Sequence, residues 1–170
     1  IYELQMECGA LAEDNLGDTQ QALRFYFAAC RLGLCHKEAF EYLARVQEQC
    51  HQYRDLVSTL EGLKDLYQKP EDKRLVLKRM ARIYKNALQQ QDKALEIYSA
   101  ILEENAEDSE VLAEMALIHS EEGNHEQLSE ILRTQAACAN EVHEAIDIYL
   151  KLAQLWTERL KSPEKALKQA

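Results

Sequence analysis

Glycine and proline are scarce in this sequence, with five glycines and two prolines among 170 residues. An all-β protein with a turn roughly every ten residues needs many more of them, so that fold class is excluded. The composition is 46% hydrophobic and 29% charged, which is typical of a globular protein and not of a disordered chain.

Long apolar runs, a signal peptide and an initiator methionine are also lacking. No run approaches the roughly 18–20 apolar residues of a membrane-spanning helix, so we expect no membrane partner. The chain opens on Ile1-Tyr2-Glu3-Leu4, already in helix-like sequence. We therefore expect a fragment of a longer protein that lacks its native N-terminus.

Basic residues are fewer than acidic ones: the sequence has 20 Lys and Arg and 30 Asp and Glu, which gives a formal charge of −10. Binding to nucleic-acid phosphates needs a basic face, so this balance argues against nucleic acid as the partner.

Cysteine pairs with Cys-x-x-Cys spacing are absent. The five cysteines are Cys8, Cys30, Cys35, Cys50 and Cys138. Cys35-His36 and Cys50-His51 have the residue types of a zinc site, but a helix over 37–50 would separate them by roughly 20 Å at ~1.5 Å per residue. Ligands so far apart cannot share one tetrahedral ion with bonds of about 2 Å. We predict no metal site, free and mostly buried thiols, and a reducing compartment, which favours a cytoplasmic location over the periplasmic alternative.

Catalytic motifs are absent as well: there is no Gly-rich phosphate loop, no HExxH and no GxSxG. The histidines are scattered at His36, His51, His119, His125 and His143. We predict no catalytic residue, no cofactor and no enzymatic activity. The competing hypothesis, a helical hydrolase or transferase, requires a deep pocket with perturbed carboxylates or histidines.

An internal repeat is the strongest positive feature of the sequence. Alanines that follow an apolar or small residue recur at Ala10, Ala44, Ala81, Ala116 and Ala153, with spacings of 34, 37, 35 and 37 residues. Each of these marker alanines lies in a stretch with helical periodicity, such as Leu77, Met80, Ala81 and Tyr84. In the second repeat, the polar Gln47 takes one of these positions. A second apolar helix is predicted to begin twelve or thirteen residues after each marker.

Turn and capping residues lie between the two predicted helices of a repeat. Gly17-Asp18 and Gly123-Asn124 are typical helix stops. Asp18 has capping-box spacing to Gln21, Asp92 is expected to be an N-cap, and Ser162-Pro163 places a cap before a first-turn proline.

A helix–turn–helix unit of about 34 residues, with a small residue in its first helix and Ala-Leu early in its second, resembles the tetratricopeptide repeat. The resemblance covers the whole chain as a single solenoid fragment with repeats at about 3–36, 37–72, 73–108, 109–141 and an incomplete 142–170. It implies an all-α, right-handed solenoid of antiparallel helix pairs with about nine to ten helices. The usual proline at repeat ends is mostly absent.

A longer period of 71 or 72 residues joins alternate markers, such as Ala10 with Ala81 and Ala81 with Ala153. This two-unit super-repeat is similar to long bacterial tetratricopeptide arrays. It predicts that the native protein continues at both ends, since a solenoid needs polar capping repeats and neither terminus has one.

The resemblance implies a binding role, because the first helix of each pair lines a concave groove in this family. Helical geometry then directs positions near each marker toward that groove. The predicted partner-binding residues are Arg45, Gln49, Lys78, Arg82, Lys85 and Asn86. Tyr42 is a further candidate for an aromatic groove lining.

Charge is strongly segregated along the chain. Residues 69–93 carry eight basic and three acidic residues, whereas 94–147 carry fourteen acidic residues and one basic residue. We therefore predict that the basic stretch receives an acidic or carboxylate-bearing segment of a protein partner. Its alternatives are solvated cations or cations paired with neighbouring acids. The acidic stretch 103–130 is interpreted as a solubilising face, with docking of a basic partner or of another copy as its alternative.

Some members of this family clamp a C-terminal carboxylate with Lys and Asn residues. Lys78 matches the first Lys, but Arg82 and Glu114 stand where Asn is expected. The sequence departs from that pattern, so a chaperone-tail clamp is not favoured.

The sequence thus predicts a non-catalytic protein-interaction scaffold. The alternative is a self-assembling spacer that forms a homo-oligomer through uncapped repeat ends, where Trp156 and Leu160 would lack cover.

Overall fold

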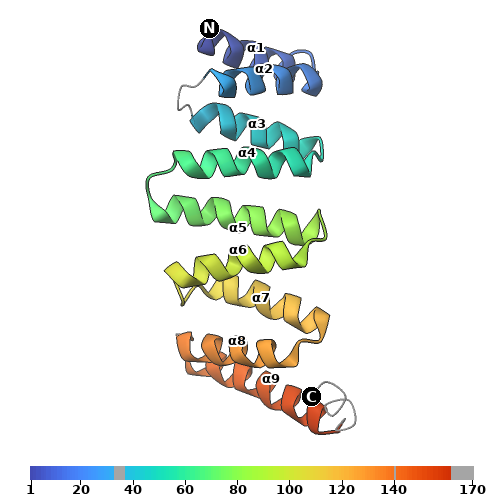
Figure 1. Cartoon of the computed structure of the whole chain (residues 1–170), viewed down its shortest axis with the longest axis vertical. Helices are drawn as coiled ribbons and strands as arrows, with labels where there is room; N and C mark the ends of the chain where they lie inside the picture. Colours follow the sequence, from blue (N-terminus) through green and yellow to red (C-terminus); the bar gives the residue numbers. More distant parts are fainter. Residues whose placement is uncertain (33–36, 140, 162–170) are drawn as a thin grey trace. The chain divides into compact units, whose positions relative to one another are not determined.

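The protein is all-α in the computed structural model, which describes residues 1–32, 37–139 and 141–161. Nine helices and no strand occur within these ranges (Figure 1). They are α1 (Tyr2–Asp14), α2 (Thr19–Arg31), α3 (Lys37–Gln49), α4 (Tyr53–Leu66), α5 (Pro70–Asn86), α6 (Gln91–Glu104), α7 (Ser109–Glu122), α8 (His125–Cys138) and α9 (Val142–Lys161). The predicted fold class is confirmed. The second helix expected after Ser162-Pro163 lies outside the described residues.

The chain divides into two compact units, Ile1–Ile97 and Tyr98–Ala170, with the boundary inside α6. In the first unit α2 packs against α1 and α3, and α4 packs against α3 and α5. In the second unit α8 packs against both α7 and α9. Short connections reverse the chain between helices, so consecutive helices run antiparallel (Figure 1). The prediction of one continuous solenoid stays a prediction.

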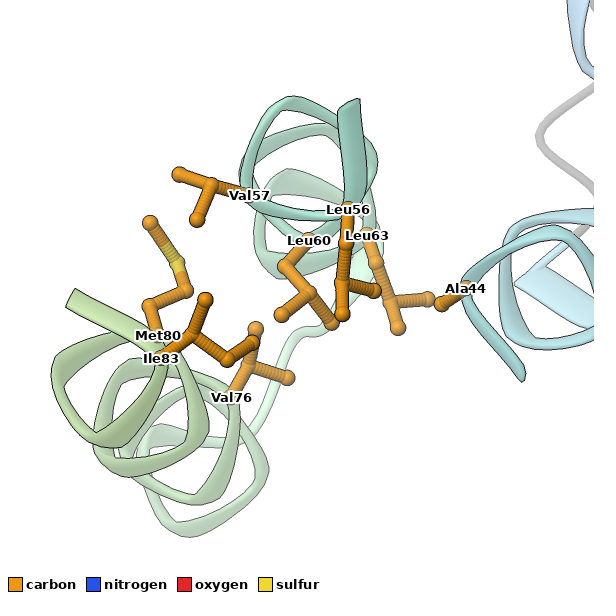
Figure 2. Packing of buried hydrophobic residues seen from close by; sticks show 8 residues of the cluster. All are labelled: Ala44, Leu56, Val57, Leu60, Leu63, Val76, Met80 and Ile83. Atoms are coloured by element: carbon orange, nitrogen blue, oxygen red, sulfur yellow. The ribbon is translucent and has the colours of Figure 1, made fainter. Parts of the chain in front are cut away.

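Part of the core of the first unit is formed by α4 and its two neighbours. One buried cluster comprises Ala44, Leu56, Val57, Leu60, Leu63, Val76, Met80 and Ile83. Figure 2 shows the α4 side chains reaching both ways, with Leu63 toward Ala44 of α3 and Val57 beside Met80 of α5. Burying one such aliphatic side chain contributes about 1.5–3 kcal/mol to folding. The α4 stripe therefore joins one helix pair to the next.

The marker alanines do not all behave alike. Ala44 and Ala81 are completely buried, which fits their predicted role in close helix approach. Ala10 and Ala116 are only partly buried, and Ala153 is exposed. A close approach of paired helices therefore explains the alanine at two of the five marker positions. It does not explain the exposed Ala153.

Capping follows the sequence in most places. The Asp18 carboxylate accepts a hydrogen bond from the backbone N–H of Gln21 at 3.0 Å, and Gly123 ends α7 with a φ of 72°. The expectation for Asp92 is wrong: α6 begins at Gln91, so Asp92 lies in the first turn, where its charge faces the positive helix terminus. Asp108 caps α7 by accepting from the N–H of Val111, which sequence reasoning missed.

Candidate functional site

Glu13 on α1 connects three helices of the first unit through its carboxylate. Its side chain is only 12% exposed, and its Oε2 atom lies 2.8 Å from Arg45 Nη2 on α3. Tyr26 on α2 donates its hydroxyl to the same oxygen at 3.3 Å. A mostly buried carboxylate needs such partners, because an isolated charge loses its hydration on burial.

Two aromatic rings complete this cluster. The ring of Tyr26 stacks on that of Tyr42 with centroids 5.3 Å apart, and the Arg45 guanidinium lies 5.0 Å from the Tyr42 centroid. Burial, together with the negative charge of Glu13, raises the pKa of Tyr26 to about 12. Tyr26 is therefore neutral and remains a hydrogen-bond donor over the physiological pH range.

A second ion pair joins α3 to α5, between Glu48 and Arg79. The two pairs, Glu13–Arg45 and Glu48–Arg79, bring α3 within side-chain reach of α1 and of α5. We call the exposed side chains of α1, α3 and α5 around these pairs the first-helix face.

The six predicted binding residues all lie on α3 and α5. Arg45 is about half exposed, but its charge is paired with Glu13. Gln49, Arg82 and Asn86 are exposed, whereas Lys78 and Lys85 are partly buried. Lys78, Arg82 and Lys85 each also take part in an interaction within the chain.

Sequence reasoning missed Arg79. The signal was a repeated acid-to-arginine spacing, since Glu13 and Arg45 are 32 residues apart and Glu48 and Arg79 are 31 apart. That separation, close to one repeat, is what a pair between consecutive first helices requires.

A separate groove of about 630 Å³ lies among α2, α3 and α4. Its lining residues are Gln20, Leu23, Arg24, Phe27, Cys30, Arg31, Phe40, Leu43, Gln47, Gln52, Asp55, Ser58 and Thr59. They follow helical spacing on each of the three helices, so one face of each helix contributes. We call this the α2–α4 groove. The prediction of binding residues included none of its members.

Gln47 is the unusual residue in this groove. It is 5% exposed, and its Oε1 atom has no hydrogen-bond partner among the described residues. The equivalent positions of the third and fourth repeats hold Tyr84 and His119. The sequence signal was the polar residue in an otherwise apolar helical pattern.

Side chains that could bind a metal ion do not cluster in the part of the chain that the structure describes. There, no group of three or more His, Cys, Asp or Glu side chains could hold a metal ion. Cys35-His36 lies outside the described residues, while His51 contacts the Tyr53 hydroxyl at 2.9 Å through Nδ1. His119, at the repeat position that Tyr84 holds in α5, is buried. No helix within the described residues is long and apolar enough to span a membrane.

Helix α9 exposes a stripe of large apolar side chains. Val142, Ile146, Tyr149 and Leu150 are each more than half exposed, at 79%, 52%, 54% and 56%. Tyr149 occupies the same repeat position as Leu112 of α7. Leu112 is only 2% exposed, so this position is buried in α7 and exposed in α9. The side chains of Trp156 and Leu160, on which the sequence-based expectation of an uncovered end depended, lie outside the described residues.

The antiparallel helix pairs define an all-α helical-repeat fold. No family model and no curated protein matches the sequence. Solved structures do match. A tetratricopeptide repeat protein from Parabacteroides merdae has a TM-score of 0.64 at 20% identity over 95% of this chain, which spans only 62% of that protein's length.

Two further structures have the same architecture. MamA from Desulfovibrio magneticus, residues 41 to the end, gives a TM-score of 0.56 at 13% identity and covers 96% of each chain. The APC/C hetero-tetramer Cut9–Hcn1 gives 0.52 at 15% identity over 89% of this chain and 30% of the other. These likenesses establish the fold, and the predicted tetratricopeptide-repeat architecture is confirmed.

Proposed function

We propose that this protein is a non-catalytic interaction scaffold that binds an acidic segment of a protein partner on the first-helix face. In this role the face corresponds to the concave groove expected from the repeat resemblance. Lys78, Arg82 and Lys85 would supply the charge, and Gln49 and Asn86 would supply hydrogen bonds. Arg45 has a lesser part, because Glu13 already neutralises it.

The observation that carries this proposal is that two ion pairs join α1, α3 and α5, the first helices of consecutive repeats. Glu13–Arg45 and Glu48–Arg79 cross between consecutive first helices, so the cations of α5 continue a surface shared with α3. Helices tied together in this way lose little conformational entropy on binding, which favours affinity.

The similar structures support an interaction role in general terms. Cut9–Hcn1 is, by its description, an assembly of two different proteins, and its fold is like that of this chain. The basic segment 69–93, with its excess of five positive charges, adds the preference for an acidic partner.

The proposal is tested by capture of partners from a lysate of the source cells. A triple variant, Lys78→Glu, Arg82→Glu and Lys85→Glu, reverses three cations of α5 and leaves the Glu13–Arg45 pair in place. We expect a protein that is retained by the wild type to be lost by this variant, because carboxylates would then face carboxylates.

A matched control carries the same change of charge outside the basic segment 69–93: Arg54→Glu, Arg133→Glu and Lys151→Glu, all exposed residues. It should retain the partner. Circular dichroism must show equal helicity for both variants, because the three reversed residues also interact within the chain. Retention by the triple variant would refute this site, and capture of nothing by the wild type would refute the binding role.

A second candidate function is self-assembly. The apolar stripe of α9, formed by Val142, Ile146, Tyr149 and Leu150, favours it, because contiguous exposed apolar side chains mark association surfaces. In this reading the occupant of the stripe is a second copy of the chain.

A further inference from the structure

The α2–α4 groove combines an apolar floor with an exposed aromatic ring. Leu43 is buried and Phe40 half-buried at the groove, whereas Phe27 is 54% exposed. A volume of about 630 Å³ falls in the range of roughly 300–1,000 Å³ that is typical of ligand sites. Covering the Phe27 ring would remove apolar surface from water, so an apolar occupant is favoured.

The α2 wall of the groove carries two arginines. Arg24 and Arg31 are both exposed, and neither forms an ion pair with any described residue. They are seven residues apart on one helix, which separates their Cα atoms by ~10.5 Å. Two ligand carboxylates at a similar separation would each accept hydrogen bonds from one guanidinium. Such charge-assisted hydrogen bonds are stronger than neutral ones.

The groove also contains a buried hydrogen-bond acceptor without a donor. Leaving the Gln47 Oε1 atom unpaired is unfavourable, because a buried polar group loses its bonds to water. A backbone N–H from a bound segment would supply the missing donor. An apolar residue at this position would fill the same space without that disadvantage, so the amide indicates a ligand with N–H groups.

We propose that the α2–α4 groove binds an extended segment of a partner protein in which apolar residues lie between two acidic residues three positions apart. In polyproline-II conformation, three residues span about 9 Å and return to the same side of the chain. The two carboxylates then reach Arg24 and Arg31, the apolar side chains cover Phe27, and a main-chain N–H bonds to Gln47. This is a second recognition surface, formed by α2 and α4 with α3 as its floor.

The test uses fluorescein-labelled heptapeptides and fluorescence anisotropy with the full chain. The probe is Gly-Glu-Leu-Phe-Glu-Leu-Gly. Two control peptides replace its glutamates by lysine or its apolar residues by serine. We expect saturable binding of the probe alone, with a dissociation constant below about 1 mM.

Protein variants then locate the binding. Arg24→Glu with Arg31→Glu should weaken binding of the probe by about tenfold or more, since each charge-assisted bond is worth at least a factor of that order. Arg54→Glu with Lys73→Glu carries the same change of charge outside the groove and should leave binding unchanged. Gln47→Met should bind the probe more weakly while melting at a higher temperature, which a merely structural role for the amide does not predict.

Several outcomes would overturn the proposal. They are no saturable binding up to about 1 mM, equal binding of the lysine peptide, or full affinity in the Arg24/Arg31 variant. Binding of dodecanoate in place of the peptides would assign the groove to a lipid instead. The Lys78/Arg82/Lys85 triple variant should keep its affinity for the probe, so failure of this proposal is distinguishable from failure of the first-helix face.

Discussion

At the scale of single residues, Tyr26 links helix packing with electrostatics. Its side chain is 1% exposed, and an added Cβ on Gly9 would lie 2.5 Å from its Cε1 atom, so only glycine fits against the ring. At the other end of the side chain, the hydroxyl donates to Glu13. One tyrosine therefore sets the distance from α1 to α2 and helps to hold the carboxylate that pairs with Arg45.

The raised pKa of Tyr26 predicts a loss of stability at alkaline pH. The folded state holds the phenolic proton more tightly than the unfolded chain, whose pKa is near 10, so this contribution is complete below pH 10 and is lost as the pH rises toward about 12. Urea unfolding followed by circular dichroism at several pH values measures it.

The matched variant is Tyr26→Phe. At neutral pH it should be less stable by about 1 kcal/mol, because the bond to Glu13 is gone. Between pH 10 and 12 its stability should fall less steeply than that of the wild type. The thiol of Cys30, whose pKa burial raises to about 11, remains in both proteins, so both curves decline. Parallel curves would show that Tyr26 does not ionise with the expected penalty.

At the scale of helices, the approach of α3 to α4 depends on a glycine. A Cβ at Gly62 of α4 would lie 2.6 Å from Cε1 of Phe40 on α3. Phe40 also lines the α2–α4 groove. The spacing of this helix pair and the shape of the groove floor therefore depend on the same contact.

Gly62→Ala should destabilise the protein despite the better helix propensity of alanine. Overpacking against a ring costs about 1–3 kcal/mol, and the propensity gain is about 1 kcal/mol, so a net loss of about 1 kcal/mol is expected. Urea unfolding of Gly62→Ala, Phe40→Leu and the double variant measures it. The double variant should lose less than the two single losses together, because the smaller side chain relieves the clash. Strict additivity would place the strain elsewhere.

At the scale of the whole molecule, the two units differ in their exposed surfaces. The first, Ile1–Ile97, includes both candidate binding surfaces. The second, Tyr98–Ala170, exposes the apolar stripe of α9. Under the self-assembly hypothesis, that stripe is covered by another copy of the chain.

The self-assembly hypothesis predicts a mass that rises with protein concentration in light scattering. Ile146→Glu places a charge in the middle of the stripe and should keep the protein monomeric, because burying an unpaired carboxylate is unfavourable. Leu75→Glu, at a 65% exposed residue of α5, is the matched control and should associate like the wild type. A wild-type mass that stays monomeric from micromolar to near-millimolar concentration would contradict the hypothesis.

Much of the fold was predictable because its signals are local. Helical periodicity around Leu77, Met80 and Ala81 predicts a helix that the structure contains, and the Asp18 cap is where its spacing to Gln21 placed it. The candidate site was less predictable. A basic residue on a helix has the same local pattern whether it is paired or not, so sequence periodicity did not show that Arg45 pairs with Glu13.

The sequence by itself determined the repeat, the helices and the all-α class, since these depend on residues a few positions apart. Only the tertiary structure decided which charges meet, because Arg45 and Arg79 find their carboxylates about one repeat away along the chain. It also decided that Gln47, Phe27 and the arginines of α2 share one groove. Such a groove depends on the spacing between helices, which packing sets and no single stretch of sequence encodes.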